Sequence, residues 1–202
     1  MTIVLDIETL PAPAESELAL RELYERRPGR ASTFDDYLRG TSLNGNWGRI
    51  LCIGVAIDDG AVEVLHADTE RELLTEFWQR VEEASRFVGH NALEFDIPFL
   101  WKRSVIHTVK PSLNPTLFRD PAFTFDTMRE WACLPAGRGV GNPYTGLHEL
   151  AKVLGLVSSK QGIDGSQVYD YWRAGKFQEI YDYCARDVEL TRTIYKRLTF
   201  VE

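Results

Sequence analysis

Two pairs of polar residues, which comprise three acids and one tyrosine, lie near opposite ends of this 202-residue chain at spacings that put each pair on one face of its element. Asp6 and Glu8 lie in the stretch IVLDIET, which predicts a β-strand and places both carboxylates on one face. Tyr183 and Asp187 are four residues apart in YCARDVELTRTIYKRL, whose apolar residues recur at roughly helical spacing, so they share one helix face. A buried charge must be paired or bound to a cation, so we expect partners elsewhere in the chain.

A further acid, Asp96, stands on a helix expected at about residues 93 to 105. Two carboxylates about 4 Å apart repel by roughly 4 kcal/mol at an effective dielectric of 20, so four of them together need cations to stay ionised. Oxygen-only ligands suit Mg²⁺ or Mn²⁺. Two such ions form the machinery for in-line displacement at phosphorus, and the sequence therefore predicts a site for two divalent cations.

Strands and helices alternate along the chain in the order that these residues require. Strands are expected at 3 to 9, 49 to 57, 61 to 66, 86 to 89 and 122 to 125, the first three as a meander. Helices are expected at 15 to 27, 69 to 84, 93 to 105, 147 to 154, 166 to 174 and 176 to 198. This order favours an α/β fold with a mixed central sheet flanked by helices.

One domain is expected over residues 1 to 202, with a long loop or insertion at 28 to 48, a further loop at 107 to 121 and a flexible Gly-rich segment at 137 to 146. The net charge of −7 argues against broad coating of nucleic acid, although not against an enzyme that grips one chain end through metal ions. No apolar run approaches the ~20 residues of a membrane span. The start of the chain does not resemble a signal peptide, so a cytoplasmic location is the default expectation. Cys52, Cys133 and Cys184 fit a reduced compartment rather than a zinc or disulfide pattern.

Three motifs resemble those of the DEDD superfamily of 3′–5′ exonucleases. They are DIE at 6 to 8, NALEFD at 91 to 96 and YCARD at 183 to 187, and the last is similar to the tyrosine (DEDDy) branch. The histidine branch is disfavoured because Asp182 occupies the position of its histidine. The longer strings GHNALEFDIPFL and YDYCARDVELT most resemble the proofreading exonuclease domain of family-B DNA polymerases and the stand-alone bacterial proteins related to it.

The resemblance implies a ribonuclease-H-like fold with two divalent metals, Mg²⁺ or Mn²⁺. Asp6 would bridge both ions, Glu8 and Asp187 would complete the site of the metal that carries the nucleophile, and Asp96 would help to hold the second ion. Tyr183 would orient the attacking water. The implied reaction removes nucleoside 5′-monophosphates from the 3′ end of single-stranded DNA or RNA.

Four further residues are candidates for substrate contacts. In the family that the sequence resembles, the residues just after the first two acids line the pocket for the terminal nucleotide. The resemblance therefore implies that Thr9 and Leu10 line this pocket. Asn91 could hydrogen-bond the substrate backbone or brace the acidic loop. Phe95 could be a wedge or a core aromatic, and we favour the core. We interpret Asp126 as a helix N-cap rather than as an acid that supports the metal ligands.

Two other functions fit parts of the sequence. DIET loosely echoes the DxDxT of haloacid-dehalogenase-like phosphatases, but Glu8 departs from that pattern, and NALEFD and YCARD stay unexplained. A non-catalytic nucleic-acid-binding module on the same fold is the other alternative. The presence of all four acids and the tyrosine weighs against it.

Overall fold

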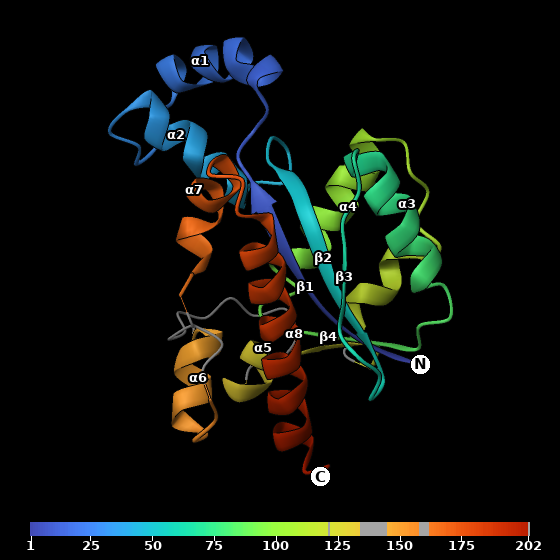
Figure 1. Ribbon diagram of the computed structural model, residues 1–202. Coiled ribbons are helices and arrows are strands. Elements are labelled where there is room, and N and C mark those ends of the chain that lie inside the picture. Colours follow the sequence, from blue (N-terminus) through green and yellow to red (C-terminus); the bar gives the residue numbers. More distant parts are fainter. Residues whose placement is uncertain (121, 134–144, 158–161, 202) are drawn as a thin grey trace.

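A five-stranded mixed sheet forms the centre of the protein in the computed structural model, which describes residues 1–120, 122–133, 145–157 and 162–201 (Figure 1). The strands, in sheet order, are β3 (Glu63–Leu65), β2 (Arg49–Ile57), β1 (Thr2–Leu10), β4 (Arg86–Gly89) and β5 (Thr124–Asp126). β2 pairs antiparallel with both β1 and β3, whereas β4 pairs parallel with both β1 and β5. The prediction of an α/β fold with a mixed sheet is confirmed.

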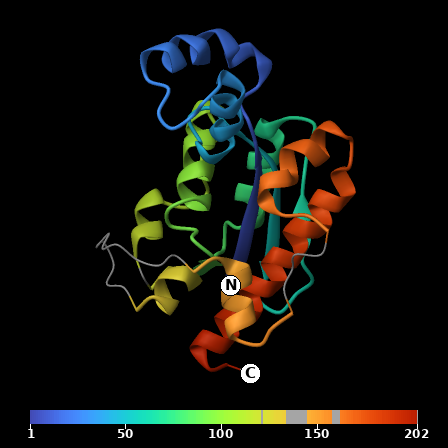
Figure 2. The same ribbon diagram turned by 90° about the vertical axis from the view of Figure 1, so that its left-hand side faces the viewer.

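Helices cover both faces of this sheet (Figures 1 and 2). One face carries α3 (Glu70–Arg80) and α4 (Asp96–Ile106), which contact β2. The other face is crossed by the long α8 (Phe177–Thr199), and the helices that contact α8 are α5 (Thr127–Trp131), α6 (Leu147–Val153) and α7 (Val168–Arg173). Within the described residues, no helix combines the length and apolarity that crossing a bilayer would need.

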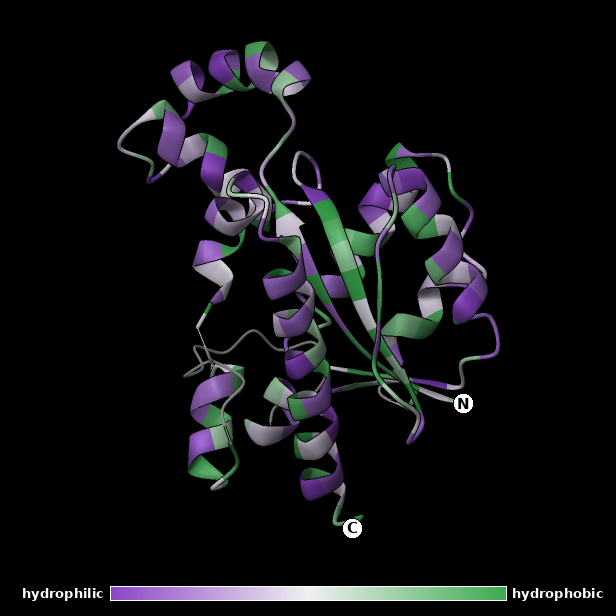
Figure 3. Ribbon diagram, viewed as in Figure 1, coloured by the Kyte–Doolittle hydropathy of each residue, from purple (hydrophilic) through white to green (hydrophobic). Residues whose placement is uncertain are grey.

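The alternation of side chains along β1 decides which residues face α8. Val4 lies on that face and packs against Val188, so Asp6 and Glu8 project to the same side. The intervening residues join the larger core with α3 and α4, and they are Ile3, Leu5 and Ile7. Figure 3 shows hydrophobic residues along β2, while α3 and α8 alternate between hydrophobic and hydrophilic, as expected for helices that pack with one face.

Residues 11–48 form a helical arm at one end of the molecule (Figure 2). It comprises a 3-10 turn at Ala14–Ser16, α1 (Glu17–Arg26), α2 (Phe34–Gly40) and a second 3-10 turn at Thr41–Leu43. The structure thus places helical elements inside the segment 28 to 48, where the sequence favours a long loop. The local signal is Thr33, which caps α2 in a capping box with Asp36.

Other differences from the predicted elements are local. The expected loop at 107 to 121 contains a 3-10 helix at Pro115–Arg119, and α4 begins at Asp96 rather than near residue 93. Residues 91 to 95 form a turn instead, since Asn91 has φ of 62° and leaves helical geometry. The predicted flexible segment lies outside the described residues up to position 144.

Gly54 allows α8 to approach the sheet opposite Asp6, its partner in the register of β1 and β2. A Cβ at Gly54 would lie 2.6 Å from Val188 Cγ2 and 2.8 Å from Cys184 Sγ, closer than van der Waals contact permits. Val188 and Cys184 lie on the same helix as Asp187, so the glycine sets how near that helix brings its carboxylate to β1.

Gly54→Ala should therefore lower the free energy of unfolding by about 1–3 kcal/mol, because α8 must move away from the sheet. Urea denaturation would measure the change. Gly40→Ala is the matched control, since a Cβ at Gly40 has no atom within 4 Å and is expected to be neutral or mildly stabilising. Equal stabilities for the two variants would contradict the close contact.

Candidate active site

The C-terminal half of β1 presents two carboxylates to α8. Ligand atoms of Asp6, Glu8 and Cys184 all lie within 4.8 Å of one another. Glu8 is buried, whereas Asp6 keeps part of its surface exposed. Cys184 Sγ also donates a hydrogen bond to the Asp6 carbonyl over 3.7 Å. The sequence prediction did not include Cys184, although its position three residues before Asp187 places it on the same helix face.

Asp96 approaches Asp6 and Glu8 from the edge of β1 that pairs with β4. β4 pairs with β1 only as far as Val4, so the edge of β1 beyond that point has no strand partner on this side. The Ile7 N–H, which lies between Asp6 and Glu8 in the chain, donates instead to Asp96 Oδ1 at 3.1 Å. The end of the parallel pairing thus opens a position that the first residue of α4 fills.

The turn that delivers Asp96 is held by a second buried acid, Asp126. Its Oδ1 accepts from the Asn91 N–H at 2.9 Å, and its Oδ2 accepts from the Leu93 N–H at 3.0 Å. Asp126 also caps α5 by accepting from the N–H groups of Met128 and Arg129. The interpretation of Asp126 as an N-cap is confirmed, and the same carboxylate braces the motif that ends at Asp96.

Tyr183 and Asp187 are both buried on α8, at 5% relative exposure each. Tyr183 and Asp187 lie near one another, as their spacing of four residues on one helix face predicts, and the charge of Asp187 acts on the Tyr183 phenol. Burial, followed by the charges of Asp187 and Glu8, raises the pKa of Tyr183 above its usual range. A Cβ on Gly165, in the 3-10 turn Gly165–Gln167, would lie 3.9 Å from this hydroxyl.

The electrostatics of the four acids reflect their proximity. Burial raises the pKa of Asp6 well above its usual range, and the nearby charges of Asp96 and Asp187 raise it further. Burial and then the charge of Asp6 do the same to the pKa of Glu8. Burial also raises the pKa of Asp96 to about 7. The structure therefore brings all four predicted acids and the tyrosine into one neighbourhood.

One known protein family matches most of this chain. A family model described as "Predicted 3'-5' exonuclease related to the exonuclease domain of PolB" matches residues 46–122 and 139–202, more than half of the chain. The chain belongs to this family. The matched segments of the PolB-related exonuclease family include Asp96, Tyr183 and Asp187, whereas Asp6 and Glu8 precede the first matched residue.

A solved structure supports the fold expected of the PolB-related family. The family B DNA polymerase from the hyperthermophilic archaeon Pyrobaculum calidifontis matches with a TM-score of 0.61 at 18% sequence identity. The match covers 98% of this chain and 24% of the polymerase chain, and at this identity it shows the fold alone. The fold is consistent with a ribonuclease-H-like exonuclease domain. No curated protein matches the sequence significantly.

The residues predicted to contact substrate have varied surroundings in this member of the PolB-related family. Thr9 Oγ1 donates to the Ser42 carbonyl at 2.7 Å, which ties β1 to the arm. Leu10 is buried, at 2% exposure, and Phe95 is half-buried against the main core. Asn91 is half-buried in the braced turn. Substrate contact by these four residues stays a prediction.

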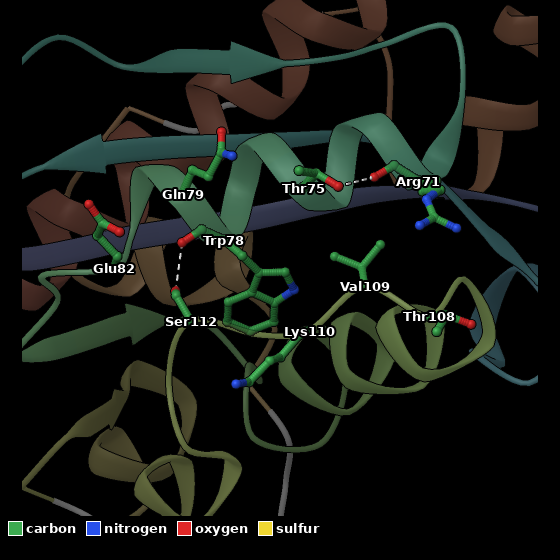
Figure 4. A pocket seen from close by; sticks show the side chains of 9 residues that line it. All are labelled: Arg71, Thr75, Trp78, Gln79, Glu82, Thr108, Val109, Lys110 and Ser112. Atoms are coloured by element: carbon green, nitrogen blue, oxygen red, sulfur yellow. Dashed lines mark hydrogen bonds between the residues drawn. The ribbon is translucent and has the colours of Figure 1, made fainter.

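A pocket of about 310 Å³ lies away from the acids, between α3 and the segment that follows α4 (Figure 4). Figure 4 shows Trp78 on α3 facing this segment, and the Ser112 hydroxyl donates to the Trp78 carbonyl at 2.6 Å. Arg71 and Lys110 also line the pocket, but none of the four acids does. It therefore forms no part of the candidate active site.

Proposed function

We propose that the chain is a metal-dependent 3′–5′ exonuclease of the tyrosine branch of the DEDD superfamily. It hydrolyses the phosphodiester at the 3′ end of single-stranded DNA or RNA and releases nucleoside 5′-monophosphates. The observation that carries this proposal is the convergence of Asp6, Glu8, Asp96 and Asp187 from three separate elements. Membership of a PolB-related exonuclease family supports it independently.

The four carboxylates fit two divalent cations in charge and in ligand chemistry. Burial raises the pKa values of Asp6, Glu8 and Asp96, and repulsion from neighbouring acids adds to this effect; a bound cation offsets both. Carboxylate oxygens are the ligands that Mg²⁺ and Mn²⁺ prefer. Asp6, Glu8 and Asp187 would hold one ion, and Asp6 and Asp96 would hold the other. When bound, such ions lower the pKa of water and neutralise charge on the phosphate.

Tyr183 acts as a hydrogen-bonding group and not as a base in this proposal. Its raised pKa keeps the hydroxyl protonated at neutral pH, so it has a proton to donate. Tyr183 thereby positions the attacking water, while the acids bind the cations.

Tyr183→Phe should lower kcat by about 10- to 100-fold, the usual range for loss of a group that orients a metal site. The carboxylates remain, so residual activity should persist. Steady-state hydrolysis of a labelled oligonucleotide measures kcat. Tyr181→Phe is the control, because it removes the same hydroxyl group from a tyrosine on the same helix that stacks on His66 instead. A loss as large as that caused by removing an acid would contradict the positioning role.

The stability of the metal-free protein should fall as pH rises. The pKa of Asp96 is about 7 in the folded protein against an ordinary 3.8, so the folded state holds a proton that the unfolded chain has lost between these values. Stability from this group is complete below about pH 3.8 and is lost as pH rises towards 7. Asp6 and Glu8 act in the same direction.

Thermal unfolding in EDTA and in Mn²⁺, at about pH 5 and about pH 8, checks this linkage. The rise in Tm on adding Mn²⁺ should be larger at the higher pH, because the cation binds the ionised carboxylates. Asp96→Asn should reduce the pH dependence measured in EDTA. A metal-induced shift of the same size at both pH values would contradict the account.

A degradation assay tests the function itself. A 5′-labelled single-stranded DNA or RNA, incubated with the protein and Mg²⁺ or Mn²⁺, should give a descending ladder of products that disappears in EDTA. An intact label with every metal and substrate would overturn the proposal. Binding of the oligonucleotide without shortening would favour the non-catalytic module instead.

A further inference from the structure

A ladder of planar side chains lies on α7 beside the candidate active site. The rings of Tyr169 and Trp172 are stacked, with centroids 5.8 Å apart and planes inclined by 13°. The guanidinium of Arg49 lies 4.8 Å from the Trp172 ring, and those of Arg39 and Arg173 lie 5.1 Å and 5.9 Å from the Tyr169 ring. We call these five residues the aromatic–arginine ladder; they come from α2, β2 and α7.

The ladder continues directly from the acids. Arg49 pairs with Leu10 in the sheet, two residues beyond Glu8 on β1. Tyr169 and Trp172 pack against the same apolar cluster that contains Leu10 and Tyr183. α7 contacts α8, and Arg39 of α2 pairs with Asp170 of α7 at 3.0 Å, so the ladder extends from α7 to the arm (Figure 1).

The arginines of the ladder are available to a ligand. Among the described residues, Arg49 and Arg173 take part in no salt bridge. The Nε of Arg49 is buried and has no hydrogen-bond acceptor in the described part of the chain, although a buried donor normally has one. Arg39 pairs with Asp35 and Asp170, both well exposed, and keeps 37% of its own side chain exposed.

Aromatic rings interleaved with arginines suit one class of ligand. Single-stranded nucleic acid is bound by cations that follow its phosphates and by rings on which its bases stack. Guanidinium groups contact phosphate through several N–H donors, and their planes also stack on bases. Arg49 and Arg173 have no acidic partner within the residues that the structure describes, and they supply positive charge in a chain whose net charge is −7.

We propose that the aromatic–arginine ladder binds the single strand a few nucleotides upstream of the 3′ end that enters the acidic site. The Arg49 guanidinium donates to a backbone phosphate, and Tyr169 and Trp172 support the neighbouring bases. This inference rests on the proposed exonuclease function, and it assigns the path along which the substrate approaches.

The test compares Arg49→Gln, Arg173→Gln and Trp172→Leu with the control Arg71→Gln. The control removes the same charge from α3, on the opposite face of the sheet. Fluorescence anisotropy measures Kd for labelled single-stranded DNA and RNA in EDTA at several salt concentrations. Hydrolysis in Mn²⁺ measures kcat/KM for the oligonucleotide and for the p-nitrophenyl ester of thymidine 5′-monophosphate, which has no upstream strand.

Each ladder variant should raise Kd about tenfold and lower the ratio of kcat/KM for the oligonucleotide to that for the ester about tenfold. The arginine variants should also reduce the slope of log Kd against log salt by about 0.7 for a lost phosphate contact. The control should change neither quantity. Arg173 is exposed, so Arg173→Gln tests the ladder even where Trp172→Leu fails to fold.

An unchanged Kd in variants with lowered Tm would overturn the proposal, because the ladder would then only clamp the arm to α7. Equal losses on the oligonucleotide and the ester would also overturn it. Absence of all hydrolysis by the wild-type protein would reject the exonuclease function alone, since the anisotropy measurement still decides whether the ladder binds a single strand.

Discussion

Asp6→Asn should lower exonuclease activity by about a thousandfold or more while raising the Tm of the metal-free protein. Loss of a group that merely supports a metal ligand costs about 10- to 100-fold, and Asp6 is the acid proposed to contact both ions. Asparagine has the same shape but no charge, so it removes the repulsion from Asp96 and Asp187 that raises the pKa of Asp6. Activity and stability therefore change in opposite directions.

Two measurements on one preparation check this: hydrolysis of a labelled oligonucleotide in Mn²⁺, and thermal unfolding in EDTA. Asp182→Asn is the control, because Asp182 is exposed on α8 and accepts a hydrogen bond from Gln178. It should leave both quantities near their wild-type values. If Asp6→Asn kept more than about a tenth of the activity, the central role of Asp6 would be wrong.

Glu70→Ala should lower the free energy of unfolding by about 3–5 kcal/mol, the cost of leaving one charge of a buried pair without its partner. Arg103 donates to Glu70 through Nε at 2.9 Å and through Nη2 at 2.7 Å, and the exposed fractions of the two side chains are 8% and 9%. The Ile50 N–H also donates to Glu70 Oε1 at 2.7 Å. One carboxylate thus joins α3, α4 and the start of β2.

Glu76→Ala on the same helix is the control, since Glu76 is exposed and should change stability by no more than about 0.5 kcal/mol. Urea denaturation of both variants gives the comparison. Replacing Glu70 and Arg103 together with leucine should recover much of the loss, because no unpaired charge then remains buried. A decrease below about 1 kcal/mol for Glu70→Ala would contradict the buried pair.

The sequence predicted those parts of the site in which both residues lie on the same strand or the same helix. The two-residue repeat of a strand put Asp6 and Glu8 on one face, and the four-residue spacing put Tyr183 beside Asp187. The position of Asp96 relative to β1 could not be predicted in this way, because it depends on where the pairing of β1 with β4 stops.

Features set by contacts between distant segments were missed or only hinted at. Gly54 within a strand signals a close backbone approach, but the sequence does not say to which helix. The spacing of the three cysteines was used only to test for a zinc site or a disulfide. This spacing carries no information about the contact between Cys184 and Asp6 on β1. The ladder joins three segments of the chain, so no local pattern predicted that Arg49 lies over Trp172.

Crystals of the protein soaked in Mn²⁺ test the central claim most directly, through the anomalous scattering of the metal. The account predicts two peaks about 3.5 to 4 Å apart, with Asp6 contacting both and with Glu8, Asp96 and Asp187 completing their ligands. Peaks elsewhere in the molecule, with these four carboxylates free of metal, would contradict it.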